Sequence, residues 1–338
     1  MGNVPVGGGN PIPVQSMTKT DTRDVRSTIR QIKALAEAGC EIIRIAVPDM
    51  RAAEALGKIK KSSPIPVIAD IHFDWRLALE AIRQGVDGLR INPGNIGARW
   101  KVAEVVSAAS DRDIPVRIGV NAGSLPKKLL EKYRHPTPEA LVESASEHID
   151  ILEGLGFREI KVSLKASNVP TTVDAYRLFS RRFRYPLHIG ISEAGPSFPG
   201  IIKSSVGLGI LLSEGIGDTI RVSLSADPLE EVRVGYEILK SLGIREKGAN
   251  IISCPTCGRC ELDIRGLASK VENRLRDIKK PLTVAVMGCA VNGPGEAREA
   301  DIGIAGGKGF GLLFRKGKVI RTVKEKDLLG ALLKEIEG

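Results

Sequence analysis

The stretch Val116-Arg-Ile-Gly-Val-Asn121 alternates apolar and polar side chains with a period of two, which is typical of a β-strand. The same alternation marks six more of the eight short β-branched runs between residues 14 and 243, and a helical pattern follows each run. Consecutive βα units with right-handed crossovers close a parallel sheet after about eight strands. The sequence therefore predicts an α/β fold with a TIM (β/α)8 barrel over residues 1–243, and a doubly wound open sheet is the alternative. The expected strands are residues 14–17, 42–46, 67–71, 88–92, 116–120, 160–164, 187–192 and 219–224.

A different pattern begins after a short linker at residues 243–248. Gly306-Gly-Lys-Gly-Phe-Gly311 lies between two apolar runs instead of opening a helix, so it predicts a hairpin loop. Residues 244–338 are therefore expected to form a small α+β domain. Its expected strands are residues 250–253, 282–287, 302–305, 311–314 and 319–323, and its expected helices are residues 264–278 and 324–336.

The alternation in the barrel strands leaves polar side chains for the lumen. The apolar members of each strand must face the surrounding helices, so the polar members point inward. Charges buried there are costly unless carboxylates or an anionic ligand balance them. The set therefore predicts a site for a small molecule that carries phosphate groups, although a structural ion pair is the alternative for any single member. The members are Arg44, Asp70, His72, Arg90, Asn92, Arg117, Asn121, Lys161, Ser163, His188, Arg221 and Ser223.

Loops that follow the strands carry further candidates. Glu193 comes directly after the strand at residues 187–192, where TIM-barrel enzymes keep catalytic carboxylates, so we expect acid–base or substrate-contact duty. The segments Asn92-Pro-Gly-Asn95 and Asn121-Ala-Gly-Ser124 offer exposed amide and hydroxyl groups that suit phosphate oxygens, with simple turns as the alternative. His135 and His148 are expected to be ordinary surface residues.

Four of the five cysteines lie in the last quarter of the chain, in Cys254-Pro-Thr-Cys257-Gly-Arg-Cys260 and in Cys289-Ala-Val-Asn-Gly-Pro-Gly-Glu296. Two cysteines on one turn can direct two thiolates at one metal centre, and a cysteine from a distant loop can complete the site. A structural zinc site would favour a second Cys-x-x-Cys pair, so the spacing favours iron–sulfur over zinc and over free or disulfide-bonded thiols. Cys40 ends a helical pattern before a core strand and is expected to be a buried structural thiol.

The charge and composition exclude several classes of protein. The 338 residues carry a formal net charge of +10, and residues 244–338 hold 18 Lys and Arg against 12 Asp and Glu. Only 4% of residues are aromatic and no recognition motif is present, so nucleic acid is not an expected partner. A basic collar for an acidic electron carrier or an anionic substrate is favoured over a merely solvated surface. No apolar run is long enough to span a bilayer and no secretory signal is visible, so a cytoplasmic location is expected.

Several of these motifs together resemble the family of bacterial 4-hydroxy-3-methylbut-2-enyl diphosphate synthases. The resemblance spans essentially the whole chain, and the order of the motifs adds to its specificity. The motifs are Pro13-Val-Gln-Ser-Met-Thr18, Ala69-Asp-Ile-His72, Arg90-Ile-Asn-Pro-Gly-Asn95, Arg117-Ile-Gly-Val-Asn121, Ser192-Glu-Ala-Gly195, Arg221-Val-Ser-Leu-Ser-Ala-Asp-Pro228, Cys254-Pro-Thr-Cys257-Gly-Arg259 and Met287-Gly-Cys-Ala-Val-Asn-Gly-Pro-Gly-Glu296.

The resemblance implies an enzyme of the methylerythritol phosphate route to isoprenoids that contains a [4Fe-4S] cluster. The reaction would be the reductive ring opening and dehydration of 2-C-methyl-D-erythritol 2,4-cyclodiphosphate to 4-hydroxy-3-methylbut-2-enyl diphosphate. It further implies that the cluster has one open iron site, because a carboxylate ligand exchanges more readily than a thiolate. The implied cluster ligands are Cys254, Cys257, Cys289 and Glu296.

The resemblance also implies roles in the barrel and partners outside it. Glu193 would assist protonation or orient substrate hydroxyl groups, and reduced ferredoxin or flavodoxin would supply the electrons. The family is a homodimer in which the cluster domain of one subunit caps the barrel of the other. The residues that would hold the diphosphate are Arg44, Arg90, Arg117, Asn121, Lys161 and Arg221.

Cys260 departs from the family pattern and leaves two other functions open. As a fourth ligand it would saturate the cluster, whereas a bystander thiol is the expectation because Glu296 is retained. An iron–sulfur electron-transfer or sensing protein would use all four cysteines, but it has no reason for a cationic lumen. A methyltransferase of the pterin-binding barrel type would resemble the barrel without needing the cluster domain.

Overall fold

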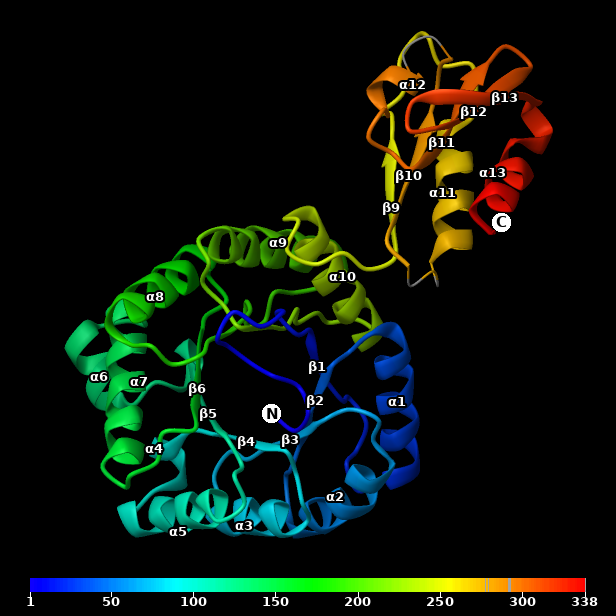
Figure 1. Ribbon diagram of the computed structural model, residues 1–338. Helices are drawn as coiled ribbons and strands as arrows, with labels where there is room; N and C mark the ends of the chain where they lie inside the picture. The colour runs from blue at the N-terminus through cyan, green and yellow to red at the C-terminus, as the bar shows by residue number, and fades with distance from the viewer. Residues whose placement is uncertain (277, 279, 291–292, 338) are drawn as a thin grey trace. The chain divides into compact units, whose positions relative to one another are not determined.

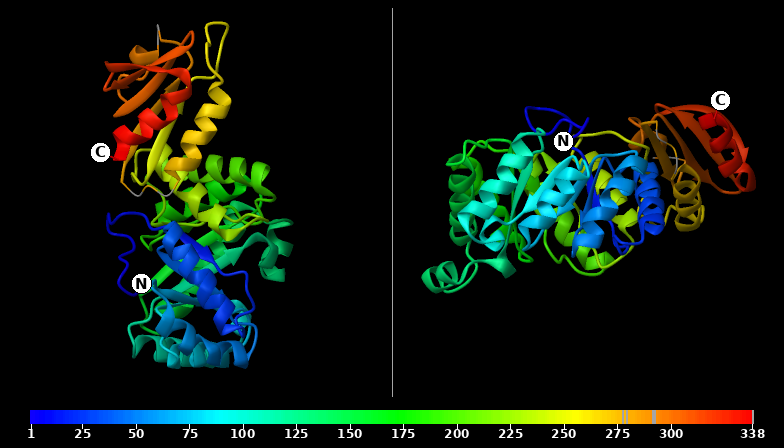
Figure 2. Two further views of the ribbon diagram at one scale, coloured as in Figure 1. Left: turned by 90° about the vertical axis from the view of Figure 1, so that its right-hand side faces the viewer. Right: turned by 90° about the horizontal axis from the view of Figure 1, so that it is seen from below.

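The computed structural model describes residues 1–276, 278, 280–290 and 293–337, without the side chains of residues 93 and 296. The described chain divides into two compact units, Met1–Arg245 and Glu246–Gly338, and Figures 1 and 2 draw both. Among the described helices, none is both long and apolar enough to cross a membrane.

Eight parallel strands form a closed ring in the first unit (Figure 1). Strands β1 to β6 pair in sequence order as one sheet, and β7 pairs with β8. Parallel bridges join Val162 to Leu187 and Val14 to Ile220, which connects β6 to β7 and β8 back to β1. The predicted TIM barrel is therefore confirmed, and the open-sheet alternative is wrong. The strands are β1 Gln15–Met17, β2 Ile42–Ala46, β3 Val67–Asp70, β4 Gly88–Ile91, β5 Val116–Asn121, β6 Ile160–Lys165, β7 His188–Ile189 and β8 Thr219–Ile220.

Helices surround the strands, and polar side chains define where many of them begin. Asp49 accepts a hydrogen bond from the amide of Ala52, and Asp227 accepts one from the amide of Leu229, so each side chain satisfies an N–H group that the helix itself leaves free. The helices are α1 Val25–Ala38, α2 Met50–Ser62, α3 Trp75–Arg83, α4 Pro93–Ile96, α5 Arg99–Ser110, α6 Lys127–Tyr133, α7 Pro138–Glu153, α8 Val169–Arg182, α9 Ser197–Ser213 and α10 Pro228–Ser241.

The main hydrophobic core lies between the strands and the helices. Alternate strand residues such as Ile43, Ile45 and Leu89 pack there with helix residues such as Leu35 and Leu56. The intervening strand positions therefore face the lumen, as the alternation predicted. The barrel thus keeps its hydrophobic burial outside the ring and leaves the inside to polar groups.

Two barrel strands are shorter than predicted. β7 and β8 pair over only two residues each, where runs of six residues were expected. Beyond them the chain stays attached by single hydrogen bonds, from the Arg221 amide to the Ile189 carbonyl at 3.1 Å and from the Ser192 amide to the Ala166 carbonyl at 3.1 Å. A regular ladder gives way to individual bonds where the chain turns outward at the mouth of the barrel.

The second unit is a five-stranded mixed sheet with helices, which confirms the predicted α+β pattern. The strand order is β13-β12-β11-β10-β9, and α11 and α13 pack on it around Val271, Val284 and Leu332. The last helix begins four residues later than predicted, because its apolar face starts only at Leu328. The elements are β9 Ala249–Ser253, α11 Ile264–Leu275, β10 Leu282–Met287, α12 Gly293–Glu296, β11 Ile302–Gly307, β12 Phe310–Arg315, β13 Lys318–Lys324 and α13 Leu328–Glu337.

Candidate active site

The barrel lumen gathers charged side chains from neighbouring strands around one carboxylate. Asp70 at the end of β3 lies 3.2 Å from Arg90 Nη1 and 3.6 Å from Arg44 Nε. His72 Nε2 lies 3.5 Å from the same carboxylate. Burial raises the pKa of Asp70, but Arg44, His72 and Arg90 together lower it by a larger amount. The pKa of Asp70 therefore lies well below its usual value. Asp70 is therefore an anion that balances only part of the positive charge around it.

Several buried donors in the lumen have no hydrogen-bond partner among the described residues. Arg117 has two such nitrogens, Nε and Nη1, and its side chain is almost fully buried. Four further buried nitrogens also lack a hydrogen-bond partner there: Arg90 Nε, Arg221 Nε, Lys161 Nζ and His188 Nε2. Leaving buried donors unpaired costs free energy, and folded proteins rarely retain such groups without a use for them. The lumen is thus built for an added acceptor-rich anion.

Two glycines make room for the cations. A Cβ at Gly119 would lie 2.2 Å from Arg90 Nε, and a Cβ at Gly190 would lie 2.7 Å from Lys165 Nζ. Gly119 occupies an inward position of β5, and Gly190 directly follows β7. Any larger residue would displace the charged group beside it.

Burial and the neighbouring positive charges lower the pKa values of the lumen lysines. Burial lowers the pKa of Lys165 well below its usual value, and Arg117, Arg221, Arg44 and Arg90 lower it further. Burial, with Arg117 adding to it, lowers the pKa of Lys161 to about 7. An anion among these groups would relieve the repulsion that depresses them.

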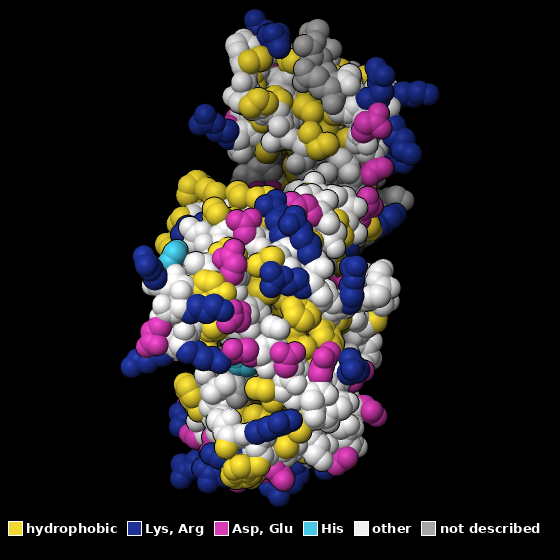
Figure 3. Space-filling view, turned by 90° about the vertical axis from the view of Figure 1, so that its left-hand side faces the viewer, with side chains coloured by type: hydrophobic (Ala, Val, Ile, Leu, Met, Phe, Trp, Pro, Cys, Tyr) yellow, Lys and Arg dark blue, Asp and Glu magenta, His cyan; other side chains and the backbone are white. Residues whose placement is uncertain are grey.

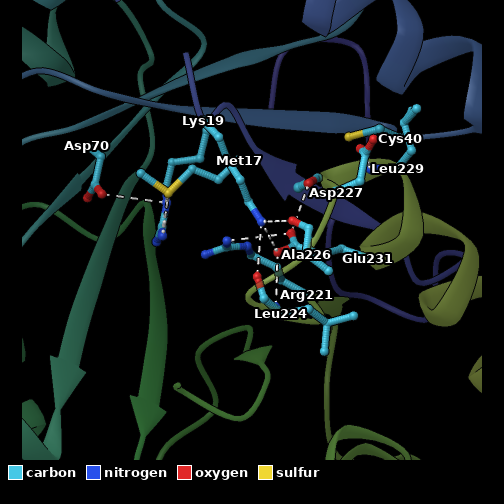
Figure 4. A network of polar contacts seen from close by, with 12 residues as sticks. Met17, Lys19, Cys40, Asp70, Arg221, Leu224, Ala226, Asp227, Leu229 and Glu231 are labelled. Carbon is cyan, nitrogen blue, oxygen red and sulfur yellow. Dashed lines mark hydrogen bonds and ion pairs between the residues drawn. The ribbon is translucent and has the colours of Figure 1, made fainter. Parts of the chain in front are cut away.

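A second ion-pair group closes the lumen between β8 and β1 (Figure 4). Glu231, from the first turn of α10, is buried and lies 3.3 Å from Lys19 Nζ and 3.6 Å from Arg221 Nη2. It also accepts hydrogen bonds from Ser16 Oγ at 3.2 Å and from the Leu224 amide at 3.0 Å. Lys19 donates in addition to the carbonyls of Leu224 and Ala226. Glu231 therefore holds Arg221 and Lys19 in place at the rim.

A pocket of about 390 Å³ opens at the carboxyl ends of β5, β6 and β7. Lys165 supplies its buried cation, and Asn121, Ser124, Ser192 and Glu193 supply polar groups. Glu193 has a φ of 51°, a left-handed conformation that is rare for a residue with a side chain. Such conformations concentrate at functional sites because the surrounding structure must impose them. This position at the C-terminal face is where TIM-barrel enzymes bind their substrates.

The predicted site residues lie at different depths. Asn121 and Lys165 pair at the mouth, whereas Arg117 and Lys161 pair four residues deeper in the same strands. Ser163 is buried between these layers, and Ser223 is half-buried beyond β8. His188 is fully buried, and its Nδ1 lies 2.7 Å from Thr219 Oγ1. Of the predicted residues, Asn121 and Glu193 therefore line the pocket, and Arg117, Lys161 and His188 lie deeper in the lumen.

Two expectations about exposed polar residues are wrong. Asn92 is buried, where an exposed side chain was expected, and its Oδ1 accepts from the Gly94 amide at 3.1 Å as the cap of α4. His148 is not a surface residue. It is buried on α7, and its Nε2 accepts from the Gly94 amide at 3.0 Å. The helical pattern around His148 could not predict this contact, because Gly94 lies 54 residues away in the sequence.

Some groups at the site were missed from the sequence. Lys165 continues the alternation of Lys161 and Ser163, so the strand pattern alone could have included it. Lys19 and Glu231 come from a loop and a helix, where no strand pattern points inward. Ser167 and Ser192 also line the pocket, beside Ser124 of the segment that the sequence had already indicated.

The cysteines of the second unit lie at one edge of its sheet. Parallel pairing of β9 with β10 places Cys254 beside Gly288, whose amide donates to Cys254 Sγ at 3.1 Å. Cys260 differs, because its thiol donates to the Leu262 carbonyl at 3.1 Å. Cys257 is exposed, and Cys289 follows Gly288 directly. Glu296 ends α12, but its side chain lies outside the described part of the chain.

The donor set suits an iron–sulfur group in its chemistry. Soft thiols of the loop after β9 lie against Gly288, where a Cβ would be 3.1 Å from Cys254 Sγ and 2.8 Å from Cys260 Sγ, and Cys289 follows Gly288 in the next loop. An amide that donates to Cys254 Sγ stabilises a thiolate there. Within the described residues, no three His, Cys, Asp or Glu side chains are already arranged as a metal site. Cys40, in contrast, is a buried structural thiol as predicted, and burial raises its pKa to about 12.

Fold and site together define a TIM-barrel enzyme for an anionic small molecule, joined to a separate thiol-bearing unit. Comparison with protein families agrees. The GcpE TIM-barrel domain matches residues 1–236, and the GcpE protein C-terminal domain matches residues 250–338. The chain belongs to the GcpE family.

Close relatives carry one name. The 4-hydroxy-3-methylbut-2-en-1-yl diphosphate synthase (flavodoxin) of Geobacter sulfurreducens is 67% identical over 100% of this chain and 96% of its own length. The synthase of the same name from Thermodesulfovibrio yellowstonii is 66% identical over 99% of this chain and 96% of its own length. The synthase of the same name from Clostridium perfringens is 60% identical over 100% of this chain and 97% of its own length.

Solved structures resemble the barrel alone. Dihydropteroate synthase of Coxiella burnetii, in complex with pteroic acid, has a TM-score of 0.51 at 13% identity and covers 71% of this chain and 96% of its own. 3-Dehydroquinate dehydratase of Geobacillus kaustophilus has a TM-score of 0.50 at 15% identity, with 71% and 95% covered. At these identities the likeness shows a common fold and says nothing of the reaction.

Proposed function

We propose that this chain carries out the reaction for which its relatives are named, the reductive ring opening and dehydration of 2-C-methyl-D-erythritol 2,4-cyclodiphosphate to 4-hydroxy-3-methylbut-2-enyl diphosphate. One ring C–O bond to phosphate and one C–OH bond break, a C=C bond forms with two added electrons, and the hydroxyl takes up a proton and leaves as water. The observation that carries the proposal is the set of buried cationic groups with unpartnered N–H donors in a lumen that opens at Glu193.

The barrel side chains bind and orient the diphosphate. Guanidinium groups of Arg90, Arg117 and Arg221 offer unpaired N–H donors, which match phosphate oxygens in geometry and charge. Asp70 and Glu231 hold part of this array in position by ion pairs that need no ligand. The remaining members proposed to contact substrate are Arg44, His72, Asn92, Asn121, Lys161, Ser163, His188 and Ser223.

Glu193 is proposed to move or orient a proton. Its carboxylate lies on the rim of the pocket, exposed to whatever the pocket holds. The imposed φ of 51° fixes its backbone, so the side chain projects from a defined point. A carboxylic acid there can protonate the departing hydroxyl oxygen.

The second unit, proposed as a domain from residue 244 to the end, would hold a [4Fe-4S] cluster through Cys254, Cys257, Cys289 and Glu296. When bound, the cluster supplies the two electrons from reduced flavodoxin or ferredoxin. Cys254 Sγ already accepts a hydrogen bond from a backbone N–H group, as a thiolate ligand does. The Cys260 thiol instead donates a hydrogen bond to the Leu262 carbonyl. This contrast supports Cys260 as a bystander. The reducing cytoplasm is the compartment in which such thiols persist.

A second copy of the chain is proposed to cover the mouth of the barrel with its cluster unit. Large apolar side chains stand exposed on segments that follow β2, β3, β4 and β7, all of which lie at the carboxyl end of the ring. They are Met50 at 39% exposure, Phe73 at 70%, Trp100 at 57% and Phe198 at 78%. Exposed apolar groups around a site mark a surface that another protein covers.

The proposed reaction is tested with anaerobically purified protein, the cyclodiphosphate and a chemical reductant such as dithionite. We expect the hydroxymethylbutenyl diphosphate to form with one water lost per turnover. A sample with a full complement of iron and sulfide that yields no product would contradict the proposal.

The ligand set is tested by comparing Glu296→Ala with Cys260→Ser. We expect Cys260→Ser to keep both its iron content and its turnover, and Glu296→Ala to lose turnover. The opposite result would show that Cys260 is the fourth ligand.

A further inference from the structure

The last three strands of the second unit carry an uninterrupted positive charge. Residues 302–324 contain six Lys and Arg and no Asp or Glu. Arg315 pairs with Glu335 at 2.8 Å, which leaves five exposed cations without an ion pair among the described residues. These five, Lys308, Lys316, Lys318, Arg321 and Lys324, are called the basic edge.

Most of the basic edge lies on or beside β13, a strand that pairs with another strand on one side only. β13 is the outermost strand of its sheet, and every residue from Lys318 to Thr322 is exposed. Its pairing with β12 is interrupted by a register shift between Leu313 and Phe314. Such irregularities keep an edge strand from pairing with another strand. A partner would therefore meet side chains here, and not a backbone ladder.

Apolar groups stand among the cations. Val319 is 52% exposed, Ile320 is 45% exposed and Phe310 is 39% exposed. A hollow of about 450 Å³ lies beside Phe310, lined by Gly309, Lys324, Glu325 and Lys326. Charged residues around exposed apolar groups are typical of a protein-docking surface, because charge guides the approach and apolar contact retains the partner.

The topology of the sheet brings this surface to the cysteines. β13 runs antiparallel to β12, which runs antiparallel to β11, and β11 is parallel to β10. The carboxyl ends of β10, β11 and β13 therefore share one edge of the sheet. Gly288 follows β10 at this edge, and a Cβ at Gly306 of β11 would lie 3.0 Å from the Gly288 carbonyl. Lys308 and Lys324 stand at the same edge as the loop after β10, whereas Lys316 and Lys318 lie at the opposite end of β13.

We propose that the basic edge is the docking surface for an acidic electron-donor protein of the flavodoxin class. This inference rests on the proposed function, since a donor must reach the cysteine loops to reduce what they hold. The positive charge selects an acidic partner, and Lys308 and Lys324 direct it to the sheet edge at which Gly288 and Cys289 follow β10.

The test compares two double variants in the full-length, cluster-loaded enzyme. Lys308→Glu with Lys324→Glu reverses two charges of the basic edge at the end of the sheet that bears the cysteines, and Lys270→Glu with Arg274→Glu reverses two exposed charges on α11 as the control. Turnover is measured with reduced flavodoxin over a range of concentrations and, separately, with dithionite. We expect the KM for flavodoxin to rise about tenfold in the first variant only, and to lose its dependence on salt. Dithionite-driven turnover should stay within about twofold of the wild type in both variants.

Three results would overturn the inference. The first is an unchanged KM for flavodoxin in the basic-edge variant, and the second is an equal rise in the α11 control. The third is a change in oligomeric state by light scattering, which would make this edge a contact between copies of the chain. Titration of oxidised flavodoxin, followed by flavin fluorescence anisotropy, needs no turnover. It therefore tests docking even if the proposed reaction itself fails with dithionite.

Discussion

At the scale of single residues, His148 shows what a sequence pattern conceals. Its Nδ1 lies 2.8 Å from the Ser144 carbonyl and its Nε2 accepts from the Gly94 amide, so the neutral ring links α7 to the short helix α4 after β4. Periodicity places His148 on a helix, but it does not reveal which loop will cover that helix. Nor does periodicity show that Lys165 lines the pocket whereas Lys161, earlier in the same strand β6, lies deeper.

This histidine should make the barrel sensitive to acid. Burial lowers the pKa of His148 to about 4, against 6.5 when unfolded, so the unfolded chain binds the extra proton. Stability contributed by the neutral ring is full above pH 6.5 and is lost as the pH falls towards 4, by about 2–3 kcal/mol.

The measurement is urea unfolding between pH 4 and 7, followed by tryptophan fluorescence, since Trp75 and Trp100 both lie in the barrel. His148→Gln should flatten the loss at low pH, whereas His135→Gln, at an exposed position, should not. Equal slopes in the two variants would refute this assignment.

At the scale of elements, Gly288 decides how the cysteine loops meet. It joins the end of β10 to Cys289, and its missing Cβ leaves the space that two sulfur atoms occupy. Spacing of cysteines in the sequence indicated the chemistry of this region. It did not indicate that β9 and β10 pair in parallel, which is what brings Cys254 beside Gly288.

Gly288→Ala should therefore disturb the cluster site. The new methyl group would lie 2.8 Å from Cys260 Sγ and 3.1 Å from Cys254 Sγ, so one loop must move. We expect a loss of bound iron and acid-labile sulfide of about tenfold, as is typical when the surroundings of metal ligands change. Gly258→Ala in the same region, where a Cβ would meet nothing within 4 Å, is the control and should keep its iron. Equal iron content in the two variants would show that the loops do not need this space.

At the scale of the whole molecule, charge is distributed differently inside and outside the barrel. Lys and Arg mix with Asp and Glu over the face shown in Figure 3, whereas the lumen holds cations in clear excess. Strand alternation predicted the barrel and its cationic interior, because both follow from a period of two. The rim contacts made by Lys19 and Glu231 could not be predicted, because they join segments more than 200 residues apart.

The excess charge predicts that a diphosphate stabilises the barrel. Inorganic pyrophosphate at about 100 times its Kd should add about 2.7 kcal/mol, which corresponds to roughly 5–10 °C in Tm for a unit of this size. The gain should shrink as salt is added, and acetate at equal ionic strength should give none. A thermal scan followed by tryptophan fluorescence measures it, and a Tm that ignores pyrophosphate would count against an anion-binding lumen.

The unpaired guanidinium groups of the lumen have a consequence beyond the reaction. A barrel that completes its polar interior only when substrate arrives opens more often when substrate is scarce, and proteases cut the opened form. The supply of the cyclodiphosphate would then govern how long each enzyme molecule survives in the cell, so the same arginines that hold the metabolite would couple the amount of enzyme to the flow through its pathway.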